Sequence, residues 1–328
     1  MYLYIEGADE IQDEHTDEEK YELFMERINN GEKIEPNDWM PEDYRKALIR
    51  LISMHGMSEI MGALPEKEWT PKAPSLKRKL AIMAKVQDEM GHGQLLLRVA
   101  EDLQKPLGVS RKELMEGLLE GEIKFHNVFH NRTKSWADAA IIAWLVDGAA
   151  IITQTNMLNA SYGPYQRALQ RICAEEVFHA QHGEALVMAL ADGTPEQREM
   201  LQDALNRWWE SLVMFFGPPS PKVTGSSRQD IMVKYKIRVN TNEELRQAFF
   251  DKYIPRIRAL GLELPDKTIS YNEETNEWTY AEPDWEEFKK IINNNGPRSQ
   301  ARLKLRRIAH DNGSWVRRAL AEQPEAVV

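Results

Sequence analysis

Apolar side chains recur every three to four residues along five long segments between residues 41 and 216. This period places the apolar side chains on one face of an α-helix, and none of the segments alternates as a strand would. Proline or a capping serine or threonine stands at the start of these segments. The pattern predicts an all-α helical bundle built from residues 41–64, 75–103, 135–160, 164–193 and 195–216.

The rest of the chain has a different character. Residues 1–16 form an acidic arm, and a Pro-, Gly- and Ser-rich stretch at 217–227 interrupts the helical pattern. Short runs predict a helix from Ser110, another from Thr241, a β-hairpin at 267–281 and helices from Pro283 and near Arg298. We therefore expect three parts: the arm (1–16), the bundle (17–216) and a C-terminal extension packed on the bundle (217–328).

Composition narrows the class of protein. The 328 residues carry a formal net charge of −10, contain one Cys and are 42% apolar. These values exclude a disordered chain, a disulfide scaffold and a thiolate-held iron–sulfur cluster, and they disfavour a nucleic-acid partner. The longest apolar stretch, 139–152, is too short to span a bilayer, and the N-terminus lacks a signal-peptide pattern. We expect a cytoplasmic protein that binds neither membrane nor nucleic acid.

Two Glu-x-x-His motifs interrupt apolar helix faces. Glu89 and His92 form one, and Glu176 and His179 form the other. Side chains three residues apart on a helix project from the same face. A carboxylate on an otherwise apolar face is costly unless it is paired or bound to a metal ion.

Two further carboxylates share this anomaly. Glu59 continues an apolar helical stripe, and Asp147 lies in a segment that is apolar all round. Each precedes a motif Glu by about 30 residues, as two crossing antiparallel helices would require. The order carboxylate, Glu-x-x-His, carboxylate, Glu-x-x-His is that of ferritin-like di-iron and di-manganese bundles. The predicted ligands of a two-metal site are Glu59, Glu89, His92, Asp147, Glu176 and His179, whose charge of −4 two divalent cations would neutralise.

Other residues are candidates for supporting roles. Ligating histidines usually donate their second N–H to a carboxylate, so we expect Asp88 to contact His179 and Glu175 to contact His92. Both acids would otherwise be solvated residues on a helix surface. His55 is expected beside the ligands. Lys85, one turn before Glu89, would offset charge, bind substrate or lie exposed, and we name Lys85 and Asp147 as candidate catalytic residues.

Some features stay open. The basic segments 76–79 and 302–307 could hold an anionic group or could be solvated helix faces. Several glycines near the ligands could leave room for a substrate or allow close helix approach: Gly62, Gly91, Gly93, Gly148 and Gly183. The chain has no Gly-rich dinucleotide fingerprint and no P-loop. Electrons for any redox reaction are therefore expected from another protein.

Several longer stretches resemble one family, the catalytic A subunits of bacterial phenylacetyl-CoA epoxidases. They are DWMPEDYRKALIR (38–50), SEI (58–60), AKVQDEMGHG (84–93), SWADAAIIAWLVDGAA (135–150), SYGPYQRA (161–168), EEVFH (175–179) and LQDALNRWW (201–209). The resemblance implies a ferritin-like fold and epoxidation of the aromatic ring of phenylacetyl-CoA with O2 and NADPH-derived electrons. It also implies a hetero-oligomer with a flavin/iron–sulfur reductase and a ferritin-like structural subunit.

The resemblance also implies two iron ions. Glu59, Glu89 and His92 would hold one ion and the remaining three ligands the other, with Glu89 and Glu176 bridging. Three alternatives remain: a related oxygenase of another aryl-CoA such as benzoyl-CoA, a ferritin-like iron store or oxidase, and a structural helical subunit without metal.

Overall fold

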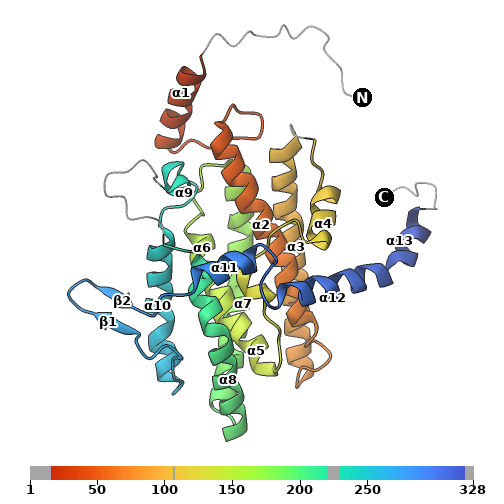
Figure 1. Ribbon diagram of the computed structural model, residues 1–328, viewed down its shortest axis with the longest axis vertical. Coiled ribbons are helices and arrows are strands. Elements are labelled where there is room, and N and C mark those ends of the chain that lie inside the picture. The colour runs from red at the N-terminus through yellow and green to blue at the C-terminus, as the bar shows by residue number, and fades with distance from the viewer. Residues whose placement is uncertain (1–15, 106–107, 220–229, 322–328) are drawn as a thin grey trace.

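The computed structural model describes residues 16–105, 108–219 and 230–321. Helices dominate it, and the predicted all-α, ferritin-like bundle is confirmed (Figure 1). The bundle part contains α1 (Asp17–Asn29), α2 (Glu42–Lys67), α3 (Leu76–Gln104), α4 (Arg111–Glu120), η2 (Asn127–His130), α5 (Trp136–Ile141), η3 (Ile142–Val146), α6 (Asp147–Thr155), α7 (Gly163–Ala191), α8 (Pro195–Val213) and η4 (Met214–Phe216).

The chain after the Pro-rich stretch follows the predicted order. It contains α9 (Ile231–Lys234), α10 (Asn242–Ala259), β1 (Ser270–Asn272), β2 (Glu277–Thr279), α11 (Trp285–Ile292), α12 (Ser299–Asn312) and α13 (Ser314–Ala321). The two strands pair antiparallel, with Tyr271 opposite Trp278, so the hairpin is confirmed. Nearly all of the predicted acidic arm and most of the predicted linker lie outside the described residues.

Capping residues explain where several helices begin. The helices predicted from Ser110 and Thr241 both begin with a capping box, and Thr194 forms another at the start of α8. Helix α1 was not predicted, although Thr16 and Glu19 form the same box at its start. Helix α2 runs past the predicted end at residue 64 to Lys67 and includes Pro65.

Two hydrophobic clusters fill the interior, and α7 contributes to both. One cluster joins α1, α2 and α3 to α7, and the other joins α5, η3, α6 and α8 to the C-terminal half of α7. Helix α10 adds Phe249, Phe250, Tyr253 and Ile254 to the second cluster, where it packs beside α6. The division between bundle and extension at residue 217 stays a prediction, because the hydrophobic core continues across it.

Among the described residues, one helix is long and apolar enough to cross a membrane by length and composition alone. It is the continuous run of α5, η3 and α6, Trp136–Thr155. The length argument made from the stretch 139–152 was therefore wrong. However, 72% of its most apolar window is buried inside the protein, and Asp147 lies within it. A helix that is apolar all round is expected at the centre of a bundle.

A π-helical turn and a glycine bring this central helix close to α7. Residues Ile142–Val146 form the π-turn directly before Asp147. A Cβ atom added at Gly183 would lie 2.1 Å from the carbonyl oxygen of Ala143. Gly183 therefore permits the close approach that brings the Asp147 helix to the Glu176 helix.

Replacing Gly183 by Ala should lower the free energy of unfolding by about 3 kcal/mol, the upper end of the usual cost of overpacking. The backbone of Ala143 would have to move to admit the methyl group. Gly91→Ala is the matched control, since no atom lies within 4 Å of its added Cβ. This helical substitution should raise stability by about 0.5–1 kcal/mol. Urea unfolding measures the free energy of unfolding of both variants. Equal changes in Gly183→Ala and Gly91→Ala would refute the packing role of Gly183.

Asp138 ties the start of the central helix to α8. Its fully buried carboxylate accepts hydrogen bonds from the Ser135 amide (2.6 Å), Trp208 Nε1 (2.8 Å) and Arg207 Nη2 (2.9 Å). Burial alone would raise the pKa of Asp138, but these donors hold it below its ordinary value.

Asp138→Asn should lower the free energy of unfolding at pH 7 by about 3 kcal/mol, because it leaves Arg207 without its buried partner. The folded pKa is depressed, so the stabilisation is full above the ordinary Asp pKa and disappears as pH falls through the folded pKa. The difference from the wild type should therefore shrink below about pH 4. Urea unfolding at pH 7 and below about pH 4 measures this difference in stability, with Asp192→Asn at an exposed position as the control. A constant difference down to about pH 2 would contradict it.

Candidate metal centre

Four helices bring the six predicted ligands together in the interior. Glu59 comes from α2, Glu89 and His92 from α3, Asp147 from the start of α6, and Glu176 and His179 from α7. Every one is buried, with at most 8% of its surface exposed. The six form two overlapping groups whose ligand atoms lie within 4.8 Å of one another: Glu59, Glu89, His92 and Glu176, and Glu89, Asp147, Glu176 and His179.

The two groups share Glu89 and Glu176. This arrangement suits two adjacent cations. The shared carboxylates would lie between the cations, and each cation would also have one carboxylate and one imidazole of its own. The sequence therefore identified side chains that the fold does bring together, and the two shared residues are the ones that the family resemblance names as bridging.

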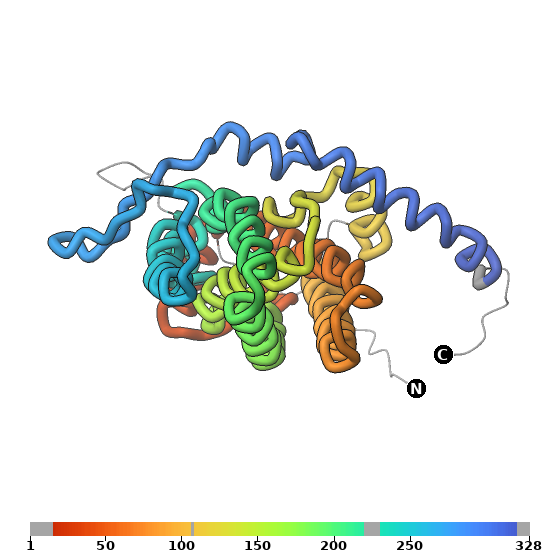
Figure 2. The backbone as a smooth tube through the Cα atoms, turned by 90° about the horizontal axis from the view of Figure 1, so that it is seen from below, coloured from red at the N-terminus to blue at the C-terminus, as the bar shows by residue number. Residues whose placement is uncertain are grey.

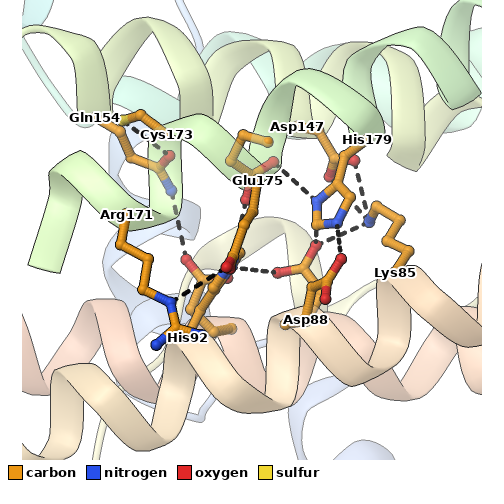
Figure 3. Close-up of polar contacts among 12 residues, drawn as sticks. Lys85, Asp88, His92, Asp147, Gln154, Arg171, Cys173, Glu175 and His179 are labelled. Atoms are coloured by element: carbon orange, nitrogen blue, oxygen red, sulfur yellow. Dashed lines mark hydrogen bonds and ion pairs between the residues drawn. The ribbon is translucent and has the colours of Figure 1, made fainter.

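Both histidines turn Nδ1 toward the carboxylates and Nε2 outward. His92 Nδ1 lies 3.6 Å from Glu176 and 3.8 Å from Glu59, and His179 Nδ1 lies 3.0 Å from Glu176. On the outer side, His92 Nε2 contacts Glu175 at 2.8 Å and His179 Nε2 contacts Asp88 at 3.3 Å (Figure 3). Both expected cross-bundle contacts are present. They favour the tautomer with Nε2 protonated, which leaves Nδ1 free to bind a cation.

The field of the cluster attracts positive charge. Burial alone would lower the pKa of His92, but the carboxylates of Glu59 and Glu89 raise it to about 10. His179 behaves alike, with a pKa raised to about 11. Burial, together with the neighbouring charge of Glu89, raises the pKa of Glu176 to about 8. Carboxylates this close and this buried must either take up protons or have cations among them.

Lys85 is buried, which excludes the exposed-lysine alternative. Only 1% of its surface is exposed, and its ammonium contacts Glu66 while lying 3.0 Å from both Glu89 and Asp147 (Figure 3 labels Lys85 and Asp147). Burial would lower its pKa, but these three carboxylates together raise it well above the ordinary lysine value. When all of these groups are ionised, Glu66 and Lys85 cancel one another in charge, and the four predicted ligand carboxylates carry −4.

Two polar residues of the site were not predicted. Glu66 is 2% exposed, and buried Gln154 lies with its Nε2 atom 3.5 Å from Glu59 Oε1. Each follows a predicted ligand on its own helix by seven residues, two turns along the same face: Glu66 after Glu59, and Gln154 after Asp147. This spacing of seven residues could therefore have identified both residues as candidates from the sequence.

The described histidines that were not predicted as ligands lie outside the two ligand groups. His55 lies beside the cluster, 2.8 Å from Glu59 Oε1 and 3.0 Å from the Tyr165 hydroxyl. His182 is buried near Phe178, and burial lowers its pKa to about 4. Neither belongs to the two groups of candidate ligands, and neither do the other described histidines, His126, His130 and His310.

Most of the named glycines serve helix packing. A Cβ atom at Gly62, Gly93, Gly148 or Gly183 would lie 2.0–2.8 Å from a neighbouring atom. Gly91 differs, since it faces a cavity of about 860 Å³ whose floor includes His92. The cavity is also lined by Met90, Leu95, Met115 and four basic residues, Arg98, Arg111, Lys112 and Arg171.

The donor set fits a pair of metal ions. His92 Nδ1 is buried and has no hydrogen-bond partner, although it faces three carboxylates. An orphaned imidazole nitrogen beside carboxylate oxygens provides the nitrogen and oxygen donors that first-row transition metals bind.

The bundle and its paired ligand groups define a ferritin-like protein with a candidate two-metal centre. Residues 16–315 match the model of one protein family, described as phenylacetic acid catabolic protein. The chain belongs to this family. It is 45% identical over 304 residues, 93% of this chain and 95% of the relative, to the A subunit of the 1,2-phenylacetyl-CoA epoxidase of Escherichia coli (strain K12).

Proposed function

We propose that this protein is the catalytic subunit of a monooxygenase that epoxidises the aromatic ring of phenylacetyl-CoA. The observation that carries the proposal is the pair of overlapping carboxylate–histidine groups buried between α2, α3, α6 and α7. The near full-length similarity to an epoxidase subunit supports this reaction and this substrate.

The two groups would hold two iron ions. Glu59, Glu89 and His92 would bind one ion, Asp147, Glu176 and His179 the other, and Glu89 and Glu176 would bridge them. When bound, the iron pair would supply the redox chemistry that transfers one atom of O2 to the ring. Mixed carboxylate and imidazole donors suit iron in both of its common oxidation states.

The protein's own residues hold and orient these ligands. Asp88 and Glu175 accept the Nε2 protons of the two histidines and so fix the direction of each Nδ1 atom. Lys85 donates to Glu89 and Asp147, so it acts on the metal site through these ligands and positions them. Its ion pair with Glu66 neutralises the buried carboxylate of that residue.

The family resemblance implies the partners of the reaction, and the lack of a nucleotide fingerprint in the sequence agrees with an external electron donor. NADPH would act only through a partner reductase that carries flavin and an iron–sulfur cluster. A second ferritin-like subunit would complete a hetero-oligomer in the cytoplasm. No nucleic acid and no membrane takes part in this scheme.

Reconstitution tests the proposal. The iron-loaded chain, the ferritin-like subunit, the reductase, NADPH and ¹⁸O2 are incubated with phenylacetyl-CoA or benzoyl-CoA, and products are analysed by mass spectrometry. We expect one ¹⁸O atom in the phenylacetyl product, lost when iron or reductase is omitted. Preferential labelling of benzoyl-CoA would identify another aryl-CoA oxygenase. Iron oxidation without labelling would indicate a ferritin-like oxidase and would refute the proposal.

A further inference from the structure

A hydrogen-bonded chain leads away from the metal centre on the side of Glu59. His55 Nε2 lies 2.8 Å from Glu59 Oε1, and His55 Nδ1 lies 3.0 Å from the Tyr165 hydroxyl. Glu59 and His55 belong to α2 and Tyr165 to α7, two helices that share one hydrophobic cluster. Figure 2 shows the long bundle helices nearly end-on. The chain therefore connects two helices across the interior of the bundle.

The hydrogen bonds of this chain have a defined direction. With its proton on Nε2, His55 donates to Glu59 and offers Nδ1 as an acceptor to the Tyr165 hydroxyl. The sulfur of Met157, 3.8 Å from the same hydroxyl, is a weaker acceptor. Tyr165 therefore has a base in position to receive its proton.

Tyr165 is buried completely, with 0% of its surface exposed. Burial raises the pKa of its phenol above the ordinary tyrosine value, so the hydroxyl keeps its proton at neutral pH. Loss of an electron turns a phenol into a strong acid, and a buried phenol therefore gives up an electron readily only where a base takes the proton. Imidazole is the usual proton acceptor of proteins near neutral pH, and His55 provides one.

Tyr162 shows the contrast. It lies three residues before Tyr165 and is equally buried, but its hydroxyl has no hydrogen-bond partner in the part of the chain that the structure describes. The hydroxyl of Tyr44, another buried tyrosine, contacts Ser161 instead. Tyr165 is thus the buried tyrosine, among those described, that a base joins to a predicted ligand.

The chain also lies apart from the cavity beside His92. Neither Tyr165 nor His55 lines this cavity of about 860 Å³. A molecule bound there would not contact the Tyr165 hydroxyl. The path from the metal centre to Tyr165 runs through Glu59 and His55, so its role is separate from binding in the cavity.

We propose that Tyr165 donates one electron to the oxidised metal centre when no aromatic substrate is present to accept the oxygen atom. The inference rests on the proposed function, which supplies the iron pair and O2 as the oxidant. One electron passes from Tyr165 to the oxidised iron pair, the phenol O–H bond breaks, and an N–H bond forms at His55 Nδ1. The products are a neutral tyrosyl radical, a His55 imidazolium and an iron pair reduced by one electron.

The surroundings favour this step and allow its reversal. The carboxylate of Glu59 stabilises the imidazolium 2.8 Å away. The partner reductase of the proposed function would later return one electron to the radical, and His55 would return the proton. Tyr165 therefore removes an oxidising equivalent that would otherwise attack the ligands.

Electron paramagnetic resonance of freeze-quenched samples tests the proposal. The iron-loaded chain with its ferritin-like subunit is reduced chemically, mixed with O2 without substrate, and frozen. The wild type should give a tyrosyl radical whose hyperfine splitting changes with ring-deuterated tyrosine. Tyr165→Phe should lose this signal, counted per bound iron pair, and the matched control Tyr162→Phe should keep it. Added phenylacetyl-CoA should reduce it, because the ring then takes the oxygen atom.

His55→Gln separates the redox role from a structural one. The glutamine amide is able to donate to Glu59 from near the Nε2 position, but it leaves no acceptor at the position of Nδ1. Iron content, measured by metal analysis, should therefore stay near the wild-type value while the radical is lost.

Three results would overturn the proposal: oxidised iron without a radical in the wild type, a radical that persists in Tyr165→Phe or His55→Gln, or a radical yield that substrate does not change. Failure of the proposed function would look different. A radical at Tyr165 in a complex that does not oxidise phenylacetyl-CoA with the reductase present would refute that function and leave the role of Tyr165 standing.

Discussion

Glu89→Ala should abolish the binding of both metal ions and with it all turnover. Glu89 is shared by both groups of ligands, so its loss removes a donor from each site at once. Replacement of a ligand that belongs to one group only, such as Glu59, should weaken metal binding without abolishing the binding of both ions. Metal analysis after dialysis against buffer containing iron measures the effect as ions bound per chain.

Glu101→Ala is the matched control for this substitution. Glu101 lies on the same helix and forms an ion pair with Arg111 outside the cluster, 2.7 Å away. It should keep full iron content and activity. Full iron binding by Glu89→Ala would show that the shared carboxylate does not bridge two ions.

Lys85→Met should lower the free energy of unfolding by about 3–5 kcal/mol, the usual cost of removing one partner from a buried charge network. Methionine fills most of the same volume, so the effect reports the ammonium rather than a cavity. Glu66, Glu89 and Asp147 would lose their common cation in a region with almost no solvent. Urea unfolding in the presence of a chelator gives this difference without a contribution from bound metal.

The double variant Lys85→Met, Glu66→Gln separates charge from packing. Removing Glu66 with Lys85 keeps the net charge of the site at −4, so it should recover about half of the lost stability and much of the iron binding. Equal stability of the single and double variants would contradict the assigned pairing. Loss of activity with normal stability in Lys85→Met would instead indicate direct contact with substrate.

The sequence identified the side chains that the fold gathers into the cluster because these residues violate local patterns. Glu59, Glu89 and Glu176 stand on helical stripes that are otherwise apolar, and Asp147 stands in a helix apolar all round. Such violations persist only where a compensating interaction exists. The contact of Asp88 with His179 followed from the usual orientation of metal-binding histidines, and the structure contains it.

The same reasoning missed residues whose role depends on three-dimensional contact. Glu66 lies beyond residue 64, where the sequence pattern ends the helix, although α2 continues through it. Its burial depends on Lys85 reaching across from α3. The tight approach at Gly183 likewise depends on a π-turn, which has no sequence signature of its own. The helix predicted near Arg298 is present as α12, but neither the separate helix α13 nor the projection of both from the bundle (Figure 2) was predicted.

The most direct test of the central claim is Mössbauer spectroscopy of the chain loaded with ⁵⁷Fe in the presence of oxygen. Our account predicts two iron ions per chain with the signature of an exchange-coupled diferric pair, lost entirely in Glu89→Ala and retained in Glu101→Ala. A single magnetically isolated ion, or iron bound equally well by Glu89→Ala, would contradict it.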